Sequence, residues 1–317
     1  MKVSRAQVDT NVIETSIELA PGIPLNVYLV KGKGKVVFID SGIQPLHGAL
    51  MQTLVEAGLS HADLAYVLNT HSHHDHIGGN GQLLKATGCK IIAPRTYRHW
   101  HSDFERHYQE FARSFPGIFE DTAELRSEVM DILDEPHPVH EAATEGMLID
   151  LGAGTVLEGI SFSGHMMEEF GWLDRHSGTL ILGDVITLMD APFIHGHVTV
   201  SGYRESLDKL ARQVKERGVK QVLMAHFPPM DRQQFDMLLQ QAHDYLLKLE
   251  KYVFEAVRQG NGALETIWRT VCEGLNKKYE FRSLATVHAH LEDLVAKQRV
   301  RQVAEQRYEI DPASSFY

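Results

Sequence analysis

The sequence predicts an α/β fold, and two observations lead to this prediction. Apolar runs at strand spacing alternate with amphipathic segments at helical spacing up to residue 94, and strands return after residue 147. Polar residues gather directly after several of the apolar runs, which is where α/β proteins build their sites. With 317 residues, 43% hydrophobic and 23% charged, the chain can bury one large domain, or one large and one small domain.

The first part of the chain reads as strands followed by an alternation of helices and strands. Residues 26–30 and 35–39 are apolar runs that flank a Gly-Lys-Gly turn, and together they predict a hairpin. The alternation continues with a helix over 45–57, a buried strand over 64–68, a helix over 82–87 and a strand over 90–93.

The middle of the chain departs from this pattern and then returns to it. Residues 95–145 carry aromatic side chains at helical spacing, which predicts an inserted helical lid. Strands are then expected over 155–157, 160–162, 171–173 and 179–182, followed by a helix over 203–217 and a strand over 221–225.

Helices dominate the C-terminal part. An apolar stripe that begins after residue 230 predicts a helix ending near Arg258. Helices over 264–275 and 283–297 follow, and residues 299–310 read as β structure. Two helices and then a short hairpin are the outline of a winged-helix module.

Composition narrows the class of protein. No apolar run of about eighteen residues predicts a membrane-spanning helix, and the first residues contain no apolar core of a secretory signal. Cys89 and Cys272 lie far apart without CxxC spacing, which favours free thiols in a reducing compartment, the cytoplasm. The net charge of −11 disfavours a large phosphate-binding surface, so we expect neither a membrane nor a nucleic acid as partner.

Histidine is unusually frequent, with 19 copies, and four of them lie with an aspartate in residues 71–76 of the stretch THSHHDHIGG. His71 and His73 are two residues apart in an extended loop, so their side chains can point the same way. Asp75 and His76 follow at once and must point toward a second site close by. Crowding of these side chains is favourable when a positive ion lies between them, so the stretch predicts a metal site.

A catalytic metal site needs further ligands, because each metal takes three or more and keeps one position for water or substrate. His165, Asp184 and His226 each come directly after an apolar run that reads as a strand. Together with His71, His73, Asp75 and His76 they supply five histidines and two carboxylates. This set is sufficient for two metal ions.

These motifs together resemble the ligand order of the metallo-β-lactamase-fold hydrolases, over about residues 12–230. The resemblance implies an αββα sandwich with the site at one edge between two sheets. It implies a catalytic domain over 1–230, with the helical insert at about 95–145, and a helical, winged-helix-like extension over 231–317. It also implies that the first metal is held by His71, His73 and His165, the second by Asp75, His76 and His226, and that Asp184 bridges both.

The same resemblance gives a role to Asp40, at the end of the VVFID strand, which matches a family aspartate that braces the metal loop. The alternative is a turn-forming aspartate before Ser-Gly. Two adjacent divalent cations would make hydroxide from a bridging water near neutral pH and polarise the scissile carbonyl or phosphoryl oxygen. Asp75 would orient this hydroxide and pass a proton to the leaving group. The ligands suit zinc, iron or manganese, and zinc is the first expectation.

Within the superfamily, the chain looks most like the glyoxalase-II-like branch, which includes thioesterases and lactonases. Met166-Met167 after the Gly-His pair, and Ala225 and Phe227 around His226, are bulkier and more apolar than the residues of many members. We therefore expect an ester-type bond, a thioester or lactone, in a small apolar acyl substrate.

Nine residues are candidates for contact with that substrate. Five of them lie in the insert, and the alternative for these is that they only pack the insert onto the sandwich. The other four follow candidate ligands or begin a helix, and the alternative for these is an ordinary loop or helix start. The nine candidates are Trp100, His101, Phe104, His107, Tyr108, Met166, His195, His197 and Tyr203.

Two other functions stay open. The RNA endonuclease branch carries a C-terminal module of similar outline, but residues 263–311 contain eight Lys or Arg against eight Asp or Glu, with Lys297, Arg299 and Arg301 as the one local basic cluster. A packing, lid or homodimer role is the simpler account of this tail. The protein could also act mainly as a regulator with little turnover, because a ligand set indicates metal binding and not catalysis.

Overall fold

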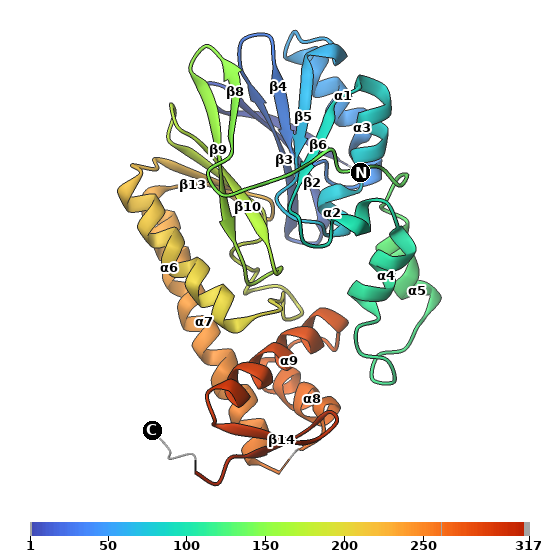
Figure 1. Ribbon diagram of the computed structural model, residues 1–317, viewed down its shortest axis with the longest axis vertical. Coiled ribbons are helices and arrows are strands. Elements are labelled where there is room, and N and C mark those ends of the chain that lie inside the picture. Colours follow the sequence, from blue (N-terminus) through green and yellow to red (C-terminus); the bar gives the residue numbers. More distant parts are fainter. Residues whose placement is uncertain (1, 261, 314–317) are drawn as a thin grey trace.

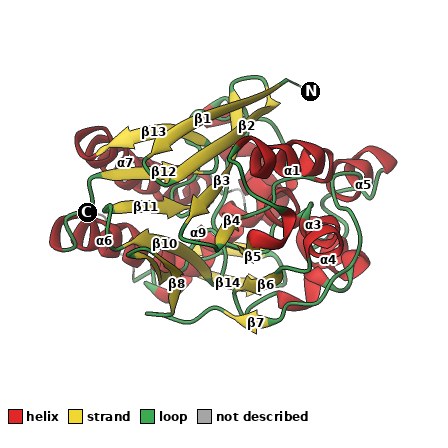
Figure 2. Ribbon diagram, turned by 90° about the horizontal axis from the view of Figure 1, so that it is seen from above, coloured by secondary structure: helices red, strands yellow, loops and turns green. Residues whose placement is uncertain are grey.

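Two β-sheets packed face to face between helices form the core of the computed structural model, which describes residues 2–260 and 262–313 (Figure 1). Apolar side chains from both sheets, among them Tyr28, Val37, Trp172 and Leu223, fill the space between them. The helices lie on the two outer faces, as the view from above shows (Figure 2). The αββα sandwich implied by the sequence is confirmed.

The first sheet has the strand order β1-β2-β3-β4-β5-β6-β7. Its first four strands pair antiparallel and the rest pair parallel. β4 is buried at every residue because it has helices on one side and the second sheet on the other. The strands are β1 (Val3–Asp9), β2 (Val12–Ala20), β3 (Ile23–Lys31), β4 (Val36–Ile39), β5 (Leu64–Leu68), β6 (Lys90–Ala93) and β7 (Glu141–Ala142).

The second sheet has the order β13-β12-β11-β10-β9-β8 and is antiparallel except for the pair β11 and β12. The crossover between these two parallel strands is the long helix α6, as parallel pairing requires. The strands are β8 (Leu148–Gly152), β9 (Thr155–Phe162), β10 (Glu169–Asp174), β11 (Thr179–Leu182), β12 (Gln221–Met224) and β13 (Phe227–Asp231).

Helices cover each sheet through one apolar face. Leu50 and Leu54 of α1 (His47–Glu56) and Leu83 of α3 (Asn80–Thr87) pack on the first sheet, beside two 3-10 turns at 44–46 and 61–63. Leu207 of α6 (Val200–Glu216) and Phe235 of α7 (Arg232–Arg258) pack on the second. α7 begins with a capping box in which Asp231 and Gln234 satisfy each other's backbone N–H groups, which fixes the start of the helix.

The insert between β6 and β8 is helical, as expected, but it ends in a strand that the sequence analysis missed. It contains a 3-10 helix (Arg98–His101), α4 (Phe104–Ala112) and α5 (Ala123–Met130). β7 is only two residues long and joins the parallel edge beside β6. Two residues carry no strand pattern of their own, because their conformation comes from pairing with β6.

The C-terminal extension consists of α8 (Leu264–Leu275), α9 (Phe281–Ala296) and a hairpin of β14 (Val300–Ala304) and β15 (Arg307–Ile310), which agrees with the expected winged-helix outline. α7 belongs to both parts of the molecule. Its first half packs against the second sheet, whereas Leu249 and Val253 of its second half pack with Trp268 of α8 and Leu284 of α9. The division at residue 230 therefore assigns to the extension a helix that also covers the sandwich.

Among the described residues, no helix combines the length and the apolar character needed to cross a membrane.

Candidate metal centre

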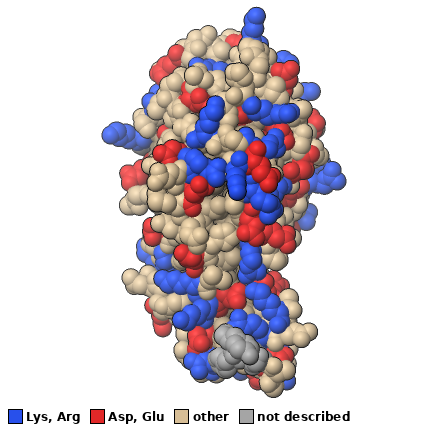
Figure 3. Space-filling model, turned by 90° about the vertical axis from the view of Figure 1, so that its left-hand side faces the viewer, with Lys and Arg blue, Asp and Glu red and all other residues tan. Residues whose placement is uncertain are grey.

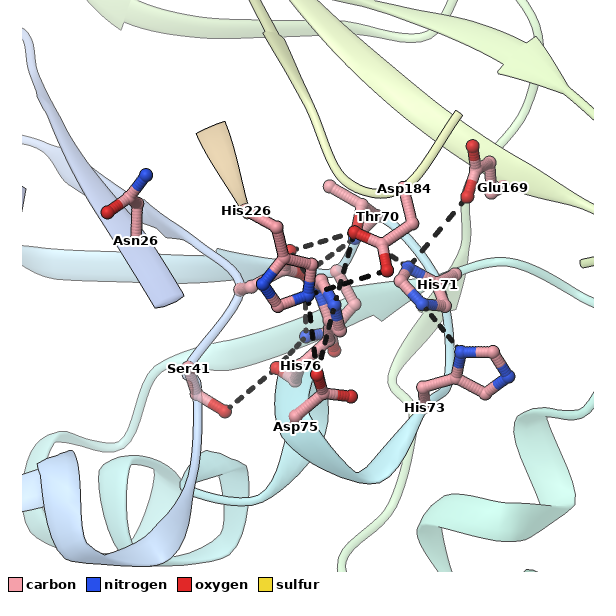
Figure 4. A network of polar contacts seen from close by, with 12 residues as sticks. Asn26, Ser41, Thr70, His71, His73, Asp75, His76, Glu169, Asp184 and His226 are labelled. Atoms are coloured by element: carbon pink, nitrogen blue, oxygen red, sulfur yellow. Dashed lines mark hydrogen bonds and ion pairs between the residues drawn. The ribbon is translucent and has the colours of Figure 1, made fainter. Parts of the chain in front are cut away.

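The candidate ligands lie at one edge of the sandwich, where strands of both sheets end (Figure 4). β5 leads into a loop with two of the histidines and then into the short helix α2 (His74–Ile77). β9, β11 and β12 each end two or three residues before another candidate. The structure thereby brings together all seven predicted ligands, which are His71, His73, Asp75, His76, His165, Asp184 and His226.

Three imidazoles form the first half of the centre. Nδ1 of His73 lies 3.0 Å from Nε2 of His71 and 2.9 Å from Nε2 of His165. Nitrogens bound at about 2.0 Å in a tetrahedral zinc site are about 3.3 Å apart, so this spacing suits a metal. Burial lowers the pKa of His71 and of His73 well below the usual range, and that of His165 to about 4. The three rings are therefore neutral at pH 7, as metal ligands must be.

A second set of nitrogen and oxygen atoms faces the first. Nε2 of His226 lies 3.4 Å from Oδ2 of Asp75 and 3.5 Å from Oδ2 of Asp184. Oδ2 of Asp184 is also 3.5 Å from Nε2 of His165, whereas Oδ1 of Asp184 lies 3.6 Å from Nε2 of His76. Asp184 therefore spans both halves of the centre, in the position of a bridging ligand.

The charges of this centre fit divalent cations. Burial alone would raise the pKa of Asp184 and of Asp75, but neighbouring histidines, His226 and His76 foremost, hold both well below the usual range. Two ionised carboxylates thus lie in a buried site, which is costly without nearby positive charge. Within the described part of the chain, the buried Nε2 of His76 has no hydrogen-bond partner, and it points at these carboxylates.

Hydrogen bonds on the far side of the rings set their tautomers. Nδ1 of His165 donates to the carbonyl oxygen of Gly196 and Nδ1 of His226 to that of Pro24, both at 2.7 Å. A carbonyl oxygen can only accept, so each ring carries a proton on Nδ1. In the neutral form that binds metal, each ring then directs the lone pair of Nε2 into the centre. The same arrangement is typical of metal-bound histidine.

Asp40 makes the contacts that a bracing role requires. Its carboxylate accepts from the backbone N–H of Thr70 at 2.7 Å and from the hydroxyl of Thr70 at 2.8 Å. It also accepts from Nδ1 of His76 at 2.9 Å. Asp40 has a φ of 61°, in the left-handed region that aspartate tolerates better than most residues, and this turns its side chain back toward the loop.

We expect Asp40→Asn to weaken metal binding by about 10- to 100-fold. The neutral amide holds the ring of His76 less firmly than a carboxylate does, and its NH₂ group would face an N–H or O–H donor of His76 or Thr70. Competition with a chromophoric chelator measures this affinity. Asp63→Asn, which alters a surface cap at Ser60, is the matched control. Equal affinity in the two variants would contradict the role of Asp40.

Two glycines allow close packing directly before two of the candidate ligands. A Cβ on Gly183, directly before Asp184, would lie 2.3 Å from the hydroxyl oxygen of Thr70. A Cβ on Gly164, directly before His165, would lie 2.5 Å from Cα of Tyr203, and this glycine has a φ of 130°. The Gly-His and Gly-Asp pairs of the sequence thus have a steric reason.

A cavity of about 980 Å³ opens over the centre, which is large for a small-molecule site. Ligand atoms of the centre form its floor. Its walls come from the tip of the first sheet, the insert, the loop after Asp184 and the start of α9. Four of the substrate-contact candidates line it, namely Trp100, Met166, His195 and His197.

Three residues of the insert that were expected at the substrate lie elsewhere. Phe104 packs with Ile77 and Leu133 beneath the metal loop, away from the cavity. Tyr108 packs with other helices of the insert and its hydroxyl donates to Asp121. His107 lies behind Trp100, with the ring centroids 4.3 Å apart. Helical spacing identified an apolar face of α4, but this face packs mainly on the protein itself.

Two further candidates are also held inside the protein. His101 is fully buried, between the hydroxyl of Ser72 at 3.1 Å and His137 at 3.0 Å, so it supports the metal loop from behind. The hydroxyl of Tyr203 lies 3.2 Å from Thr187 and its ring stacks on His197. Neither residue lines the cavity.

Several residues of the site were not predicted from the sequence. Glu169 is buried, with its carboxylate 3.9 Å from Nδ1 of His71, and burial raises its pKa well above the usual range. α9 contributes Phe281, Arg282 and Thr286 to the cavity wall. No local pattern marks these residues, because their place depends on how distant elements pack.

The loop from Ile194 to His197 is attached to α9. The backbone N–H of Ile194 donates to the hydroxyl of Ser283, and that of His197 donates to the hydroxyl of Thr286. Nε2 of His197 lies 3.1 Å from Nε2 of His290, and both rings are buried. The loop that supports His165 is thus fixed by the C-terminal extension.

This histidine pair predicts a loss of stability in acid. Burial lowers the pKa of His290 well below its usual range and that of His197 to about 3, so the unfolded chain gains protons below about pH 6.5 that the folded chain does not. Stability is therefore present above this pH and is lost as the pH falls. His290→Gln should reduce the loss between about pH 7.5 and 5.5 by about 1.4 kcal/mol. Urea unfolding of both proteins at the two pH values measures the difference, and an equal loss would contradict it.

The local basic cluster of the extension is paired with acidic residues. Lys297 lies 2.7 Å and Arg299 3.1 Å from the carboxylate of Glu250, and Arg301 lies 3.0 Å from that of Glu309. Basic and acidic side chains also alternate over the face seen in Figure 3. Such pairing leaves little positive potential for a phosphate backbone.

Comparison with known proteins agrees with this geometry. Residues 20–217 match the model of a family described as the metallo-beta-lactamase superfamily. A hydroxyacylglutathione hydrolase of Hyphomonas neptunium is 32% identical over 150 residues, which are 42% of this chain and 51% of that protein. One of Methylococcus capsulatus is 37% identical over 75 residues, 23% of this chain and 27% of that protein. The chain thus spans about half the length, or less, of these curated relatives.

Solved structures show the same fold along nearly the whole chain. A metallo-beta-lactamase family protein of Thermus thermophilus has a TM-score of 0.74 at 21% identity, covering 96% of this chain and 100% of that one. A beta-lactamase domain protein of Burkholderia ambifaria has a TM-score of 0.71 at 19% identity, covering 97% and 94%. The C-terminal extension is therefore included in the likeness.

Proposed function

The chain belongs to the metallo-beta-lactamase superfamily, and from this membership we propose that it hydrolyses an ester-type carbonyl bond, a thioester or lactone, in a small acyl substrate. One observation carries the proposal. Seven candidate nitrogen and oxygen ligands converge at one edge of the sandwich. Five of them line the floor of a cavity whose walls are mostly apolar, namely His73, Asp75, His165, Asp184 and His226. Metal-assisted hydrolysis of a bond in an apolar molecule suits this combination.

The centre suits two divalent cations, with zinc as the first expectation. When bound, two such cations make hydroxide available near neutral pH and polarise the oxygen of the scissile bond. His71, His73 and His165 would hold one of them, Asp75, His76 and His226 the other, and Asp184 both.

Asp75 combines a place in the centre with access to the cavity. Its low pKa keeps the carboxylate ionised at neutral pH, because His76 and His226 lie next to it. An ionised carboxylate can accept a hydrogen bond from the attacking water and so orient it. Asp75 would also carry a proton briefly to the leaving group.

The cavity favours an apolar acyl group. Four aromatic side chains line it, those of Trp100, Phe111, Phe193 and Phe281. The wall also contains the guanidinium of Arg282, which is already paired with the carboxylates of Glu128, at 2.8 Å, and of Glu280. A paired guanidinium attracts a charged substrate less strongly than a free one. The curated relatives are named for hydrolysis of an acylglutathione, which supports a thioester as the first substrate to test.

The test is hydrolysis by protein of known metal content. The panel contains acyl thioesters of increasing chain length, a lactone, a phosphodiester and a structured RNA, each with wild type and Asp184→Asn. We expect turnover of a thioester or lactone that improves with an apolar acyl chain and is lost in the variant. Turnover of none of the carbonyl substrates would overturn the proposal.

A metal-dependent endoribonuclease is the second candidate, because the extension has the outline of a winged-helix module. The pairing of Lys297, Arg299 and Arg301 with carboxylates argues for the small substrate instead. RNA cleavage without turnover of carbonyl substrates would make the endoribonuclease the preferred function.

A further inference from the structure

His195 reaches the metal centre although it is not one of the seven predicted ligands. It lies in the loop that follows Asp184, is 8% exposed and lines the cavity. Its Nε2 lies 3.3 Å from Oδ2 of Asp184. Its ring is 5.1 Å from that of His165 and 6.0 Å from that of His226, measured between centroids, so it faces both halves of the centre.

By distance alone, His195 could be an eighth ligand. Its Nε2 forms a group with His165 and Asp184 in which all ligand atoms lie within 4.8 Å of one another. The hydrogen bond on the other side of its ring decides against this, because Nδ1 of His195 accepts the backbone N–H of Leu188 at 2.9 Å. A backbone N–H can only donate, so Nδ1 carries the lone pair, and the proton of the neutral ring is on Nε2.

The tautomer of His195 is thus opposite to that of its neighbours. The rings of His165 and His226 donate from Nδ1 to carbonyl oxygens, so in their neutral forms they direct lone pairs inward. His195 accepts at Nδ1 and directs an N–H inward, to the part of the cavity where the carboxylate of Asp184 lies 3.3 Å away. A nitrogen that carries a proton has no lone pair for a metal.

We propose that His195 is a hydrogen-bond donor of the active site, which stabilises negative charge on an oxygen of the substrate. The proposal rests on the proposed hydrolysis, in which the carbonyl oxygen gains negative charge in the transition state. A donor fixed in advance near that oxygen, in a site that excludes water, stabilises the transition state more than the ground state.

The surrounding structure holds this donor in place. A Cβ on the next residue, Gly196, would lie 2.2 Å from the hydroxyl oxygen of Thr286, so α9 packs closely against the loop. The N–H groups of Ile194 and His197 on either side donate to α9 hydroxyls. The backbone of His195 is fixed by these contacts and its ring by the hydrogen bond from Leu188.

Two substitutions separate the roles of the two ring nitrogens. In His195→Asn, the amide oxygen can take the place of Nδ1 and accept from Leu188, and the inward donor is lost. In His195→Gln, the amide nitrogen can take the place of Nε2, and the inward donor is kept. We expect kcat/KM to fall by about 10²-fold in His195→Asn and by clearly less in His195→Gln, as for loss of one oxyanion donor.

Metal binding and anion binding test the proposal without turnover. Metal content and affinity should equal those of wild type in both variants, and a loss in both would make His195 a ligand. Binding of octanoate to the metal-loaded proteins, followed by calorimetry, should weaken about tenfold in His195→Asn and less in His195→Gln. Long-range ¹H–¹⁵N spectra of the His195 ring should show the proton on Nε2.

The outcomes distinguish the two proposals. If wild type turns over no thioester or lactone, the proposed hydrolysis fails, whereas octanoate binding still tests the donor. If wild type is active but His195→Asn equals it in turnover and in octanoate affinity, the donor role fails and the hydrolysis stands. A proton on Nδ1 would also overturn the donor role.

Discussion

Asp184→Asn is expected to lower kcat/KM by about 10³-fold. The carboxylate of Asp184 lies between both halves of the centre, 3.5 Å from Nε2 of His165 and of His226 and 3.6 Å from Nε2 of His76. Asparagine has almost the same shape but no charge, so the buried positive charge of the centre would lose its compensation. Removing one partner of a buried charged pair costs about 3–5 kcal/mol, and each 1.4 kcal/mol corresponds to about tenfold in rate.

Steady-state rates and metal content measured on the same samples test this expectation. Asp208→Asn is the matched control, because Asp208 is exposed on α6, pairs with His243 at 3.7 Å and does not line the cavity. Circular dichroism should be unchanged in both variants, since asparagine fits the space of aspartate. Near-normal turnover by Asp184→Asn would show that the centre is assigned incorrectly.

Removal of metal is expected to lower the melting temperature by roughly 10 °C. A ligand at a thousand times its dissociation constant stabilises the folded state by about 4 kcal/mol, and about 1 kcal/mol shifts the melting temperature of a chain of this size by about 2–4 °C. The metal-free centre also leaves the carboxylates of half-buried Asp75 and buried Asp184 without metal cations. Within the described residues it leaves Nε2 of His76 without a hydrogen-bond partner.

Calorimetry with and without a chelator measures this shift, and returning the metal should restore the original value. Asp184→Asn should respond less to the chelator, because it binds metal more weakly. A melting temperature that does not depend on the chelator, in protein shown to contain metal, would mean that the cations contribute nothing to the fold.

The sequence was sufficient to predict which candidate ligands meet at this edge because each one lies in a segment that follows a strand. Residues 71–76 come after β5, and His165, Asp184 and His226 come after strands of the second sheet. In a sandwich, such strand ends meet at one edge, so the topology brings these residues together without detailed knowledge of packing.

The walls of the cavity could not be predicted in this way. From their spacing in the sequence, the ring of Trp100 or that of His107 could face the cavity. In the structure only Trp100 lines it, because the ring of His107 stacks behind that of Trp100. Phe281 and Arg282 lie about 100 residues after Asp184 in the sequence. They reach the cavity because α9 packs against the loop that follows Asp184. The tautomer of His195 depends on the N–H of Leu188, which no side-chain pattern reveals.

The contact between α9 and the loop at Ile194–His197 constrains how this site can change during evolution. His165 is held by the carbonyl oxygen of Gly196, and Gly196 lies against Thr286, so a feature of the metal centre depends on a helix that supplies none of the seven ligands. The catalytic sandwich and the extension therefore cannot be exchanged freely between relatives, as separable domains can. Changes at Ser283, Thr286 or His290 would have to be matched by changes in the loop, and the two segments are expected to vary together.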